Sequence, residues 1–263
     1  MSAATLDFTY RFAFPSAVGE TERGFCLRLA TCGAQQEQPY FFDGRLLAPR
    51  ETGEMLLVLS DVVRTHFFLP RPMLLDPVVT SNEAMLRFEG FSGCCGVYAR
   101  VDILAEAFHT DYLGRGTTNV DFNNPMRAAL SRLRDHDDAR LAVGADGVEL
   151  SKGGDTVVET KVKLPIRWIK GFNEVQIYQP TMSLKIDVPG AEARRFVRSL
   201  PRSGPAKKPS FVTQTGKTIR LSQRATKGAV QFHGTHRVRV LEPLMNTAKS
   251  LRIWADEDSG TTA

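Results

Sequence analysis

The sequence predicts an α+β fold made mainly of antiparallel sheets, and three patterns lead to this prediction. Short runs of alternating apolar and polar residues are separated by turn residues, a few stretches have helical spacing, and the order strand, helix and three strands occurs twice. With 263 residues, 42% of them apolar, the chain can form one large core or two smaller ones. We predict an N-terminal α+β domain over residues 1–114 and a basic C-terminal α+β domain over residues 115–263.

The N-terminal third is predicted to contain strands on both sides of one helix. Residues 9–14, 25–31 and 40–47 alternate in the way that strands do. Residues 51–68 carry a helical stripe of apolar side chains, and the prolines that follow at 70 and 72 end the helix. The apolar positions of this stripe are Met55, Leu56, Leu59, Val62 and Val63.

Three further strands are predicted at residues 77–83, 84–92 and 96–104. In the second of them Leu86, Phe88 and Gly90 alternate with Met85, Arg87 and Glu89, which indicates a half-buried strand.

The run "FSGCCGVYARVDIL", residues 91–104, places Cys94 and Cys95 next to each other. Since the run has the composition of a buried strand, its neighbouring side chains would point to opposite faces and would not share a metal ion unless a bulge intervened, which the flanking Gly93 and Gly96 allow. We therefore predict that both thiols are reduced, mostly buried and without metal. Cys26 and Cys32 have no histidine nearby and are also predicted to be small core residues.

The first copy of the repeated order begins at residue 117. A strand is predicted at residues 117–123 and a helix at residues 124–133, with Asn124 as the N-cap and Pro125 as its first residue. Three strands follow, at residues 139–144, 147–151 and 157–165.

The second copy has the same order and follows a predicted helix, or a helix running into a strand, at residues 166–179. Its strand covers residues 183–189, and its helix at 191–201 buries Ala193, Phe196, Val197 and Leu200. Strands are predicted at residues 210–214, 218–223 and 229–234, followed by a helical stretch at 235–249 and a closing strand at 251–257.

Charge is distributed unevenly along the chain. Residues 1–150 hold 14 Arg, no Lys and 20 acidic residues, whereas residues 185–252 hold 15 basic and 3 acidic residues. A basic C-terminal part of this kind indicates an anionic partner, and a solubilising basic surface is the alternative explanation.

Patterns typical of enzymes and of metal or cofactor sites are missing from the sequence. There is no phosphate-binding loop, no nucleophile elbow and no zinc-protease helix. His233 and His236 form the only close histidine pair, with no acid or cysteine beside them, and the acidic run Asp135, Asp137 and Asp138 has the position of a solvated turn. We therefore predict a protein that is not an enzyme and has no cofactor.

The basic residues are predicted to contact the backbone of a nucleic acid, because phosphates are bound by such clusters without base-specific contacts. Phe196 and Phe211 are predicted to face the core, which argues against stacking of single-stranded bases and leaves duplex or RNA backbone, or an acidic protein. The candidate binding residues are Arg127, Arg134, Arg194, Arg195, Arg198, Arg202, Lys207, Lys208, Arg220, Arg224, Lys227, Arg237 and Arg239.

Four runs in order resemble the N-terminal region of bacterial SWIM zinc-finger family proteins: "FSGCCGVYARVDIL", "RGTTNVDFNNPMRAAL", "VKLPIRWIKGFNEVQ" and "EARRFVRSLP". The resemblance implies membership of a bacterial conflict or defence system with a MoxR-type AAA+ ATPase and a von Willebrand factor A-domain protein. The zinc motif of that family, C-x-C followed by C-x-H, is not present in this sequence, so no zinc ligands are carried over.

The segment at residues 126–165 is also similar to the helix-then-strands module of DNA sliding clamps. In that module basic helix faces point toward a DNA duplex, a role that would suit Arg127, Arg134, Arg194, Arg195 and Arg198.

Our leading hypothesis is a non-enzymatic binding component of such a system, with a basic C-terminal half that contacts nucleic acid. A sliding-clamp-like architecture is one form of this hypothesis, which the resemblance to clamp modules implies. The alternative is a protein-interaction scaffold for an acidic partner such as the ATPase or the von Willebrand protein. A hydrolase or nuclease that uses the histidine pair is the third class. No membrane segment or leader is recognised, so we expect a cytoplasmic protein, which could form homo-oligomers.

Overall fold

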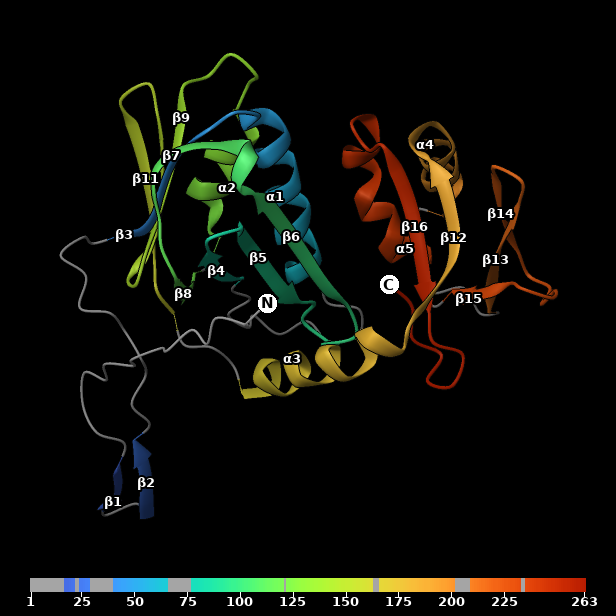
Figure 1. Cartoon of the computed structure of the whole chain (residues 1–263), viewed down its shortest axis with the longest axis horizontal. Helices are drawn as coiled ribbons and strands as arrows, with labels where there is room; N and C mark the ends of the chain where they lie inside the picture. The colour runs from blue at the N-terminus through green and yellow to red at the C-terminus, as the bar shows by residue number, and fades with distance from the viewer. Residues whose placement is uncertain are drawn as a thin grey trace, which may run out of the picture.

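The computed structural model describes residues 17–21, 24–28, 40–65, 77–120, 122–162, 166–201, 209–232 and 235–263. Its helices and sheets are mixed, and all strand pairings between the described strands are antiparallel, which confirms the predicted α+β class. Figure 1 shows two groups of elements joined by a long helix. We call residues 40–162 the N-terminal lobe and residues 183–255 the C-terminal lobe.

A short hairpin, β1 (Ala17–Thr21) and β2 (Gly24–Arg28), precedes the N-terminal lobe. The lobe itself contains β3 (Tyr40–Leu46), α1 (Pro49–Arg64), β4 (Val78–Asn82), β5 (Met85–Phe91), β6 (Tyr98–Leu104), η1 (Ala105–Ala107), β7 (Phe108–Leu113), β8 (Gly116–Asn119), α2 (Asn124–Ser131), β9 (Ala139–Gly144), β10 (Gly147–Lys152) and β11 (Asp155–Thr160).

The predicted helix at residues 166–179 is present as α3 (Ile166–Tyr178), and it is followed by η2 (Gln179–Thr181). The C-terminal lobe contains β12 (Ser183–Pro189), α4 (Gly190–Ser199), β13 (Ser210–Thr215), β14 (Thr218–Ser222), β15 (Val230–Phe232), α5 (Thr235–Val238), η3 (Arg239–Asn246) and β16 (Ser250–Ala255).

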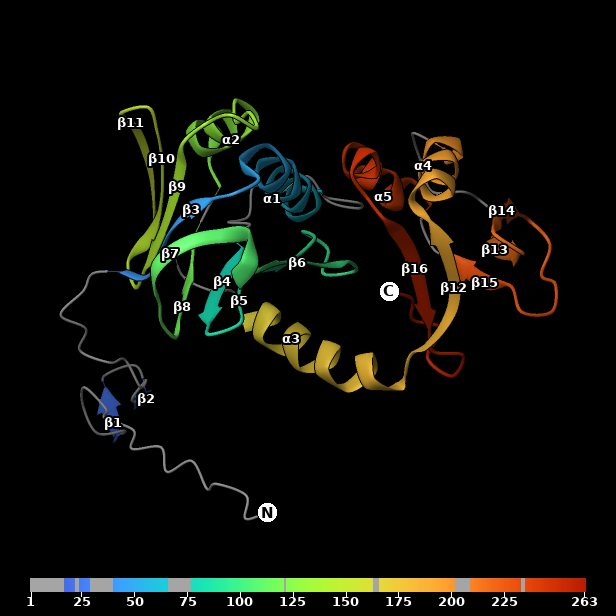
Figure 2. The same ribbon diagram turned by 45° about the horizontal axis from the view of Figure 1, so that its top comes forward.

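The N-terminal lobe consists of two strand–helix–three-strand units that exchange their first strands. β3, which leads into α1, pairs with β9 of the other unit, and β8, which leads into α2, pairs with β4. The two sheets therefore have the orders β11-β10-β9-β3-β7 and β6-β5-β4-β8. α1 and α2 pack against each other, as both views show (Figures 1 and 2). The exchange ties the two units into one body.

The C-terminal lobe makes the same exchange with fewer strands. β12, which leads into α4, pairs with β16, and β15, which leads into α5 and η3, pairs with β13. The order of the predicted second copy is therefore confirmed. Although β15 follows β14 in the chain, it pairs with β13 and not with β14, so the sheet has the order β14-β13-β15.

Buried hydrophobic residues form two clusters. The first includes Phe42, Phe88 and Trp168, and the second includes Phe196 and Val212. The last buried member of the first cluster is Trp168 and the first buried member of the second is Ile186. The division between the two cores does not coincide with the predicted domain boundary between residues 114 and 115. Strands from both sides of that boundary, β7 and β9, flank β3 in one sheet. The independent folding of residues 1–114 and 115–263 stays a prediction.

Side-chain periodicity placed most helix and strand faces correctly. Leu86, Phe88 and Gly90 are buried in β5, and α4 buries Ala193, Phe196 and Val197 against its own lobe. Leu200, which follows α4, is 1% exposed. The predicted strand at residues 9–14 and the prolines 70 and 72 lie outside the described residues.

The N-cap of α2 is Asn123 and not Asn124, which corrects the prediction by one residue. The Oδ1 atom of Asn123 accepts a hydrogen bond from the Met126 backbone amide at 3.2 Å. Its Nδ2 atom donates to Glu159 Oε2 at 2.9 Å, and Glu159 is buried on β11. Asn123 therefore both caps the helix and joins it to the sheet.

The two adjacent cysteines lie in a turn and not in a strand, because β5 ends at Phe91 and β6 begins at Tyr98. Cys94 is exposed and Cys95 is half-buried, so the prediction that both are mostly buried is wrong. Cys95 has a φ of 56°, in the left-handed region, which turns the chain back toward β6. Burial raises the pKa of the Cys95 thiol. Cys32 and the side chain of Cys26 lie outside the described residues.

Candidate nucleic-acid interface

Helix α4 carries three of the predicted arginines, and two of them are used inside the lobe. Arg194 donates from Nε to the Met245 carbonyl at 3.0 Å and from Nη2 to the Asn246 carbonyl at 2.9 Å. These carbonyls close the last turn of η3, where they have no helical donor of their own. Arg194 is therefore a cap that holds η3 against α4.

Arg195 joins α4 to β14. Its guanidinium bonds to the Glu192 carboxylate and to the Ile219 carbonyl, and the Ile219 amide donates to Glu192 at 2.8 Å. The hydrogen bond from Arg195 and the one from the Ile219 amide lower the pKa of the Glu192 carboxyl to about 2.

Arg198 is the most available of the three arginines on α4. Its side chain is 53% exposed, its Nε atom lies 3.8 Å from Glu242, and its Nη2 atom lies 3.4 Å from Asn246 Oδ1. Contacts of this length at an exposed site contribute little to the stability of the fold.

Arg239 and Arg237 also have internal roles. Arg239, 12% exposed, donates to the carbonyls of Arg198 and Leu200 at the C-terminal end of α4 and pairs with Glu242 at 3.0 Å. Arg237 donates from α5 to the Gly96 carbonyl at 3.4 Å, which links the C-terminal lobe to the β5–β6 turn of the N-terminal lobe.

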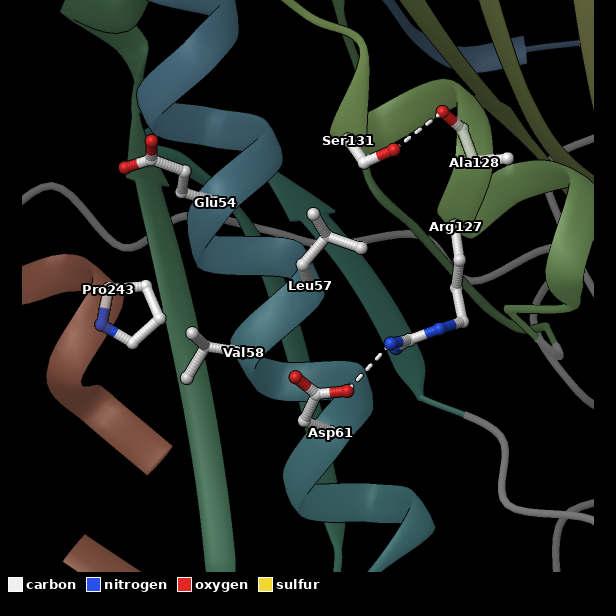
Figure 3. Close-up of a pocket in the computed structure, with 8 residues that line it drawn as sticks. All are labelled: Glu54, Leu57, Val58, Asp61, Arg127, Ala128, Ser131 and Pro243. Carbon is white, nitrogen blue, oxygen red and sulfur yellow. Dashed lines mark hydrogen bonds and ion pairs between the residues drawn. The ribbon is translucent and has the colours of Figure 1, made fainter. Parts of the chain in front are cut away.

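The two predicted arginines of the N-terminal lobe contact their own lobe. Arg127 donates from α2 to Ser60 Oγ at 2.6 Å and to Asp61 Oδ1 at 2.7 Å, both on α1. Arg134 donates to the carbonyls of Ser131 and Leu133 at the end of α2. Figure 3 shows Arg127 reaching across to Asp61, in a groove that α1 and α2 form with Pro243 of η3.

The remaining predicted cations gather at the β13–β14–β15 sheet. Arg220 lies on β14, and Arg224 and Lys227 follow in the connection to β15. Lys217, which was not predicted, lies in the β13–β14 turn. All four are exposed, and within the described part of the chain their side chains have no hydrogen bond or ion pair. Arg202, Lys207 and Lys208 lie outside the described residues.

Phe211 lies on the outer face of this sheet, which corrects the prediction that it faces the core. Val212, the next residue on β13, is fully buried, so Phe211 points to the opposite side. Thr213, two residues after Phe211 on β13, is on the same face as Phe211 and is paired with Arg220 of β14. The ring and the guanidinium therefore share one face of the sheet. The ring is half-buried there. The sequence held a signal for this arrangement: Phe211 and Arg220 each stand next to an aliphatic residue, Val212 and Ile219, and neighbouring residues of a strand point to opposite faces.

We call this region the basic sheet face: Phe211 and Arg220 share the outer face of the sheet, and three further cations lie in the β13–β14 turn and in the connection after β14. Its members are Phe211, Lys217, Arg220, Arg224 and Lys227. Cations without an internal partner can meet phosphates at little cost in lost protein contacts, and an aromatic ring can stack on a base.

Neither metal ligands nor a membrane helix is found in the described part of the chain. No group of three or more His, Cys, Asp or Glu side chains there could hold a metal ion. His233 and the side chain of His236 lie outside the described residues, so the predicted pair is not described as a site. No described helix is long and apolar enough to cross a membrane.

Comparison with known proteins gave one kind of match. No protein-family model and no curated protein matches the chain, including any SWIM-type family. Among solved structures, the chain is similar to the proliferating cellular nuclear antigen of Entamoeba histolytica, with a TM-score of 0.48 and 11% identity over 81% of this chain and 89% of that one.

Proposed function

We propose that the protein is a non-enzymatic binding component that holds a nucleic-acid backbone on the basic sheet face. The observation that carries the proposal is that Lys217, Arg220, Arg224 and Lys227 are exposed and form no hydrogen bond or ion pair with described residues. Arg220 lies close enough to Glu192 to help lower the pKa of that carboxyl. In contrast, most of the described arginines on the helices are bound to carbonyls or acids. Cations of this kind attract phosphates by releasing counterions, so the affinity falls steeply with salt.

The proposal moves the contact away from the helices. α1 carries Glu51, Glu54 and Asp61 beside its arginines, and Arg127 of α2 is paired with Asp61. A duplex lying along α1 and α2 would meet these carboxylates, which repel phosphates. The outer face of the β13–β14–β15 sheet has no acidic side chain among its strand residues.

Binding of labelled duplex DNA, single-stranded DNA and RNA, measured at increasing salt, tests the proposal. If about three to four phosphates are contacted, the logarithm of the affinity should fall with the logarithm of salt with a slope of about −3. Absence of binding to all three ligands at low salt would contradict the proposal.

Phe211 provides a test of which nucleic acid is bound. If its ring stacks on a base, Phe211→Leu should weaken binding to a single strand by about 1–3 kcal/mol and leave duplex binding unchanged. Equal loss for both ligands would show that the ring only supports the sheet.

An acidic protein is the second candidate partner for the same cations. The MoxR-type ATPase and the von Willebrand factor A-domain protein that the SWIM resemblance implies are the proposed examples of such an acidic partner. Co-purification of the chain with such a protein, and without nucleic acid, would favour the scaffold function.

A further inference from the structure

Helix α3 has a buried face that fixes it to the N-terminal lobe. Trp168 is fully buried and Gly171 lies directly under the Phe91 ring, where a Cβ atom would come within 2.7 Å of a ring carbon. The rings of Trp168 and Phe172 lie 5.7 and 5.1 Å from that of Phe91. The orientation of α3 about its own axis is therefore set by aromatic packing on β5.

The opposite face of α3 is an exposed stripe of isoleucines. Ile166, Ile169 and Ile177 are 74%, 49% and 65% exposed. At about 100° per residue these three side chains fall within an arc of about 80°, with the exposed Asn173 between them. In both views no described helix or strand covers this side of α3 (Figures 1 and 2). An ordered apolar stripe on a helix that is already anchored indicates an interaction site.

The charges beside the stripe are self-complementary. Lys170 and Glu174 are both exposed, and neither forms an ion pair with another described residue. Lys170 and Glu174 are centred on residue 172, and Ile166 and Ile177 are centred about half a residue before it. The charged pair and the apolar pair therefore share one centre along the helix. A second α3 laid antiparallel about that point would put Ile166 opposite Ile177 of the second copy and Lys170 opposite its Glu174.

We propose that a second copy of this chain docks on the outer face of α3, forming a two-fold symmetric dimer through antiparallel α3 helices. A single patch that matches itself in both apolar positions and charge is the pattern of an isologous interface. A partner of different sequence would not require the charges to be placed symmetrically about the centre of the stripe.

The contact is small, and this sets its expected strength. A helix of 13 residues is about 20 Å long, so one face of it buries less than the ~800 Å² per partner of a standard interface. The dimer should therefore dissociate on the order of micromolar concentration, and it does not involve the basic sheet face.

Sedimentation velocity of the full chain over a range of about 1 to 100 µM tests the proposal. We expect the wild-type protein to pass from monomer to dimer, and Ile169→Asp with Ile177→Asp to stay monomeric with unchanged circular dichroism. Val158→Thr, which alters a valine that is 55% exposed on β11, is the control and should dimerise as the wild type does.

A charge exchange separates the specific pairing from simple hydrophobic association. Lys170→Glu and Glu174→Lys should each weaken the dimer at least threefold, because like charges then face each other, and the double variant should restore it. A monomeric wild type, a dimer unaffected by the aspartate substitutions, or a double variant weaker than either single one would overturn the proposal.

Discussion

The two lobes share an exchange of leading strands but use their arginines differently. In the N-terminal lobe arginines pair with carboxylates on the sheet surfaces, as in Arg87 with Asp102 at 2.7 Å and Arg140 with Asp43 at 2.6 Å. In the C-terminal lobe Arg194 and Arg239 bind backbone carbonyls at the ends of helical segments. Arg134 makes a similar contact at the end of α2, and Arg239 also pairs with Glu242, so the two lobes differ in proportion. The C-terminal lobe, which has fewer acids, relies more on cations that bind carbonyls at its helix ends.

This difference shows why a count of charges overestimates a binding surface. Residues 185–252 carry 15 basic and 3 acidic residues, yet several of these cations are structural. The informative property is whether a guanidinium already has a partner. By that criterion the basic sheet face holds most of the available cations of the described C-terminal lobe, and the exposed Lys249 before β16 is a further one.

The largest effect is expected where α3 joins the N-terminal core. Trp168→Ala removes a fully buried side chain that packs on Phe91, and it should lower the free energy of unfolding by about 3–5 kcal/mol in a denaturant titration. Trp254→Ala, at a tryptophan that is 39% exposed in the C-terminal lobe, should cost less than about 1 kcal/mol. Similar losses for both variants would mean that α3 is not part of the N-terminal core.

The next largest effect on the free energy of unfolding is expected at an arginine that binds backbone carbonyls, compared with an arginine that forms no hydrogen bond or ion pair with the rest of the described chain. Arg239→Ala leaves the carbonyls of Arg198 and Leu200 without their donor and should cost about 2–3 kcal/mol of unfolding free energy. Arg220→Ala should change it by less than about 0.5 kcal/mol, because Arg220 is exposed and forms no hydrogen bond or ion pair with a described residue. A reversed order of the two values would contradict the division of roles between these arginines.

A smaller effect is expected at the start of α2. Asn123→Ala removes both the cap on the Met126 amide and the bond to the buried Glu159, and it should cost about 1–2 kcal/mol. Asn124→Ala, one residue later, should cost less than about 0.5 kcal/mol. Thermal unfolding of the two variants side by side measures the difference, and equal melting temperatures would be evidence against Asn123 as the cap.

The smallest effect is a dependence on pH that belongs to the C-terminal lobe. The hydrogen bonds from the Arg195 side chain and the Ile219 amide lower the pKa of Glu192 to about 2 from 4.5. The carboxylate therefore contributes stability that is complete above pH 4.5 and is lost as the pH falls toward 2. Glu192→Gln should lack this part of the decline. Unfolding curves at several pH values between 5 and 2 measure it, and parallel declines for both proteins would exclude the contribution of Glu192.

Periodicity predicted the elements and faces that depend on local sequence. The helical spacing of Met55 to Val63 and the buried side of α4 were both predicted from the positions of apolar residues. Strand partners were not predictable in this way, because the pairings of β3 with β9 and of β12 with β16 join segments far apart in the chain.

The candidate site was predicted only in outline. The residue types and the basic region were visible in the sequence, but the partners of Arg194 and Arg239 are backbone carbonyls about 40–50 residues away, which no local pattern encodes. The turn at Cys94 and Cys95 was missed because glycine-flanked apolar residues fit a strand as well as a hairpin turn.

The central claim is tested most directly by two double variants that remove the same charge from different places. Arg220→Gln with Arg224→Gln removes two cations of the basic sheet face, whereas Arg45→Gln with Arg115→Gln removes two exposed arginines that pair with Asp138 and Glu83 in the N-terminal lobe. We predict that the first variant reduces the salt slope of nucleic-acid binding by about 2 and the second leaves it unchanged. Equal reductions in both variants, or no change in the first, would contradict the assignment of the basic sheet face.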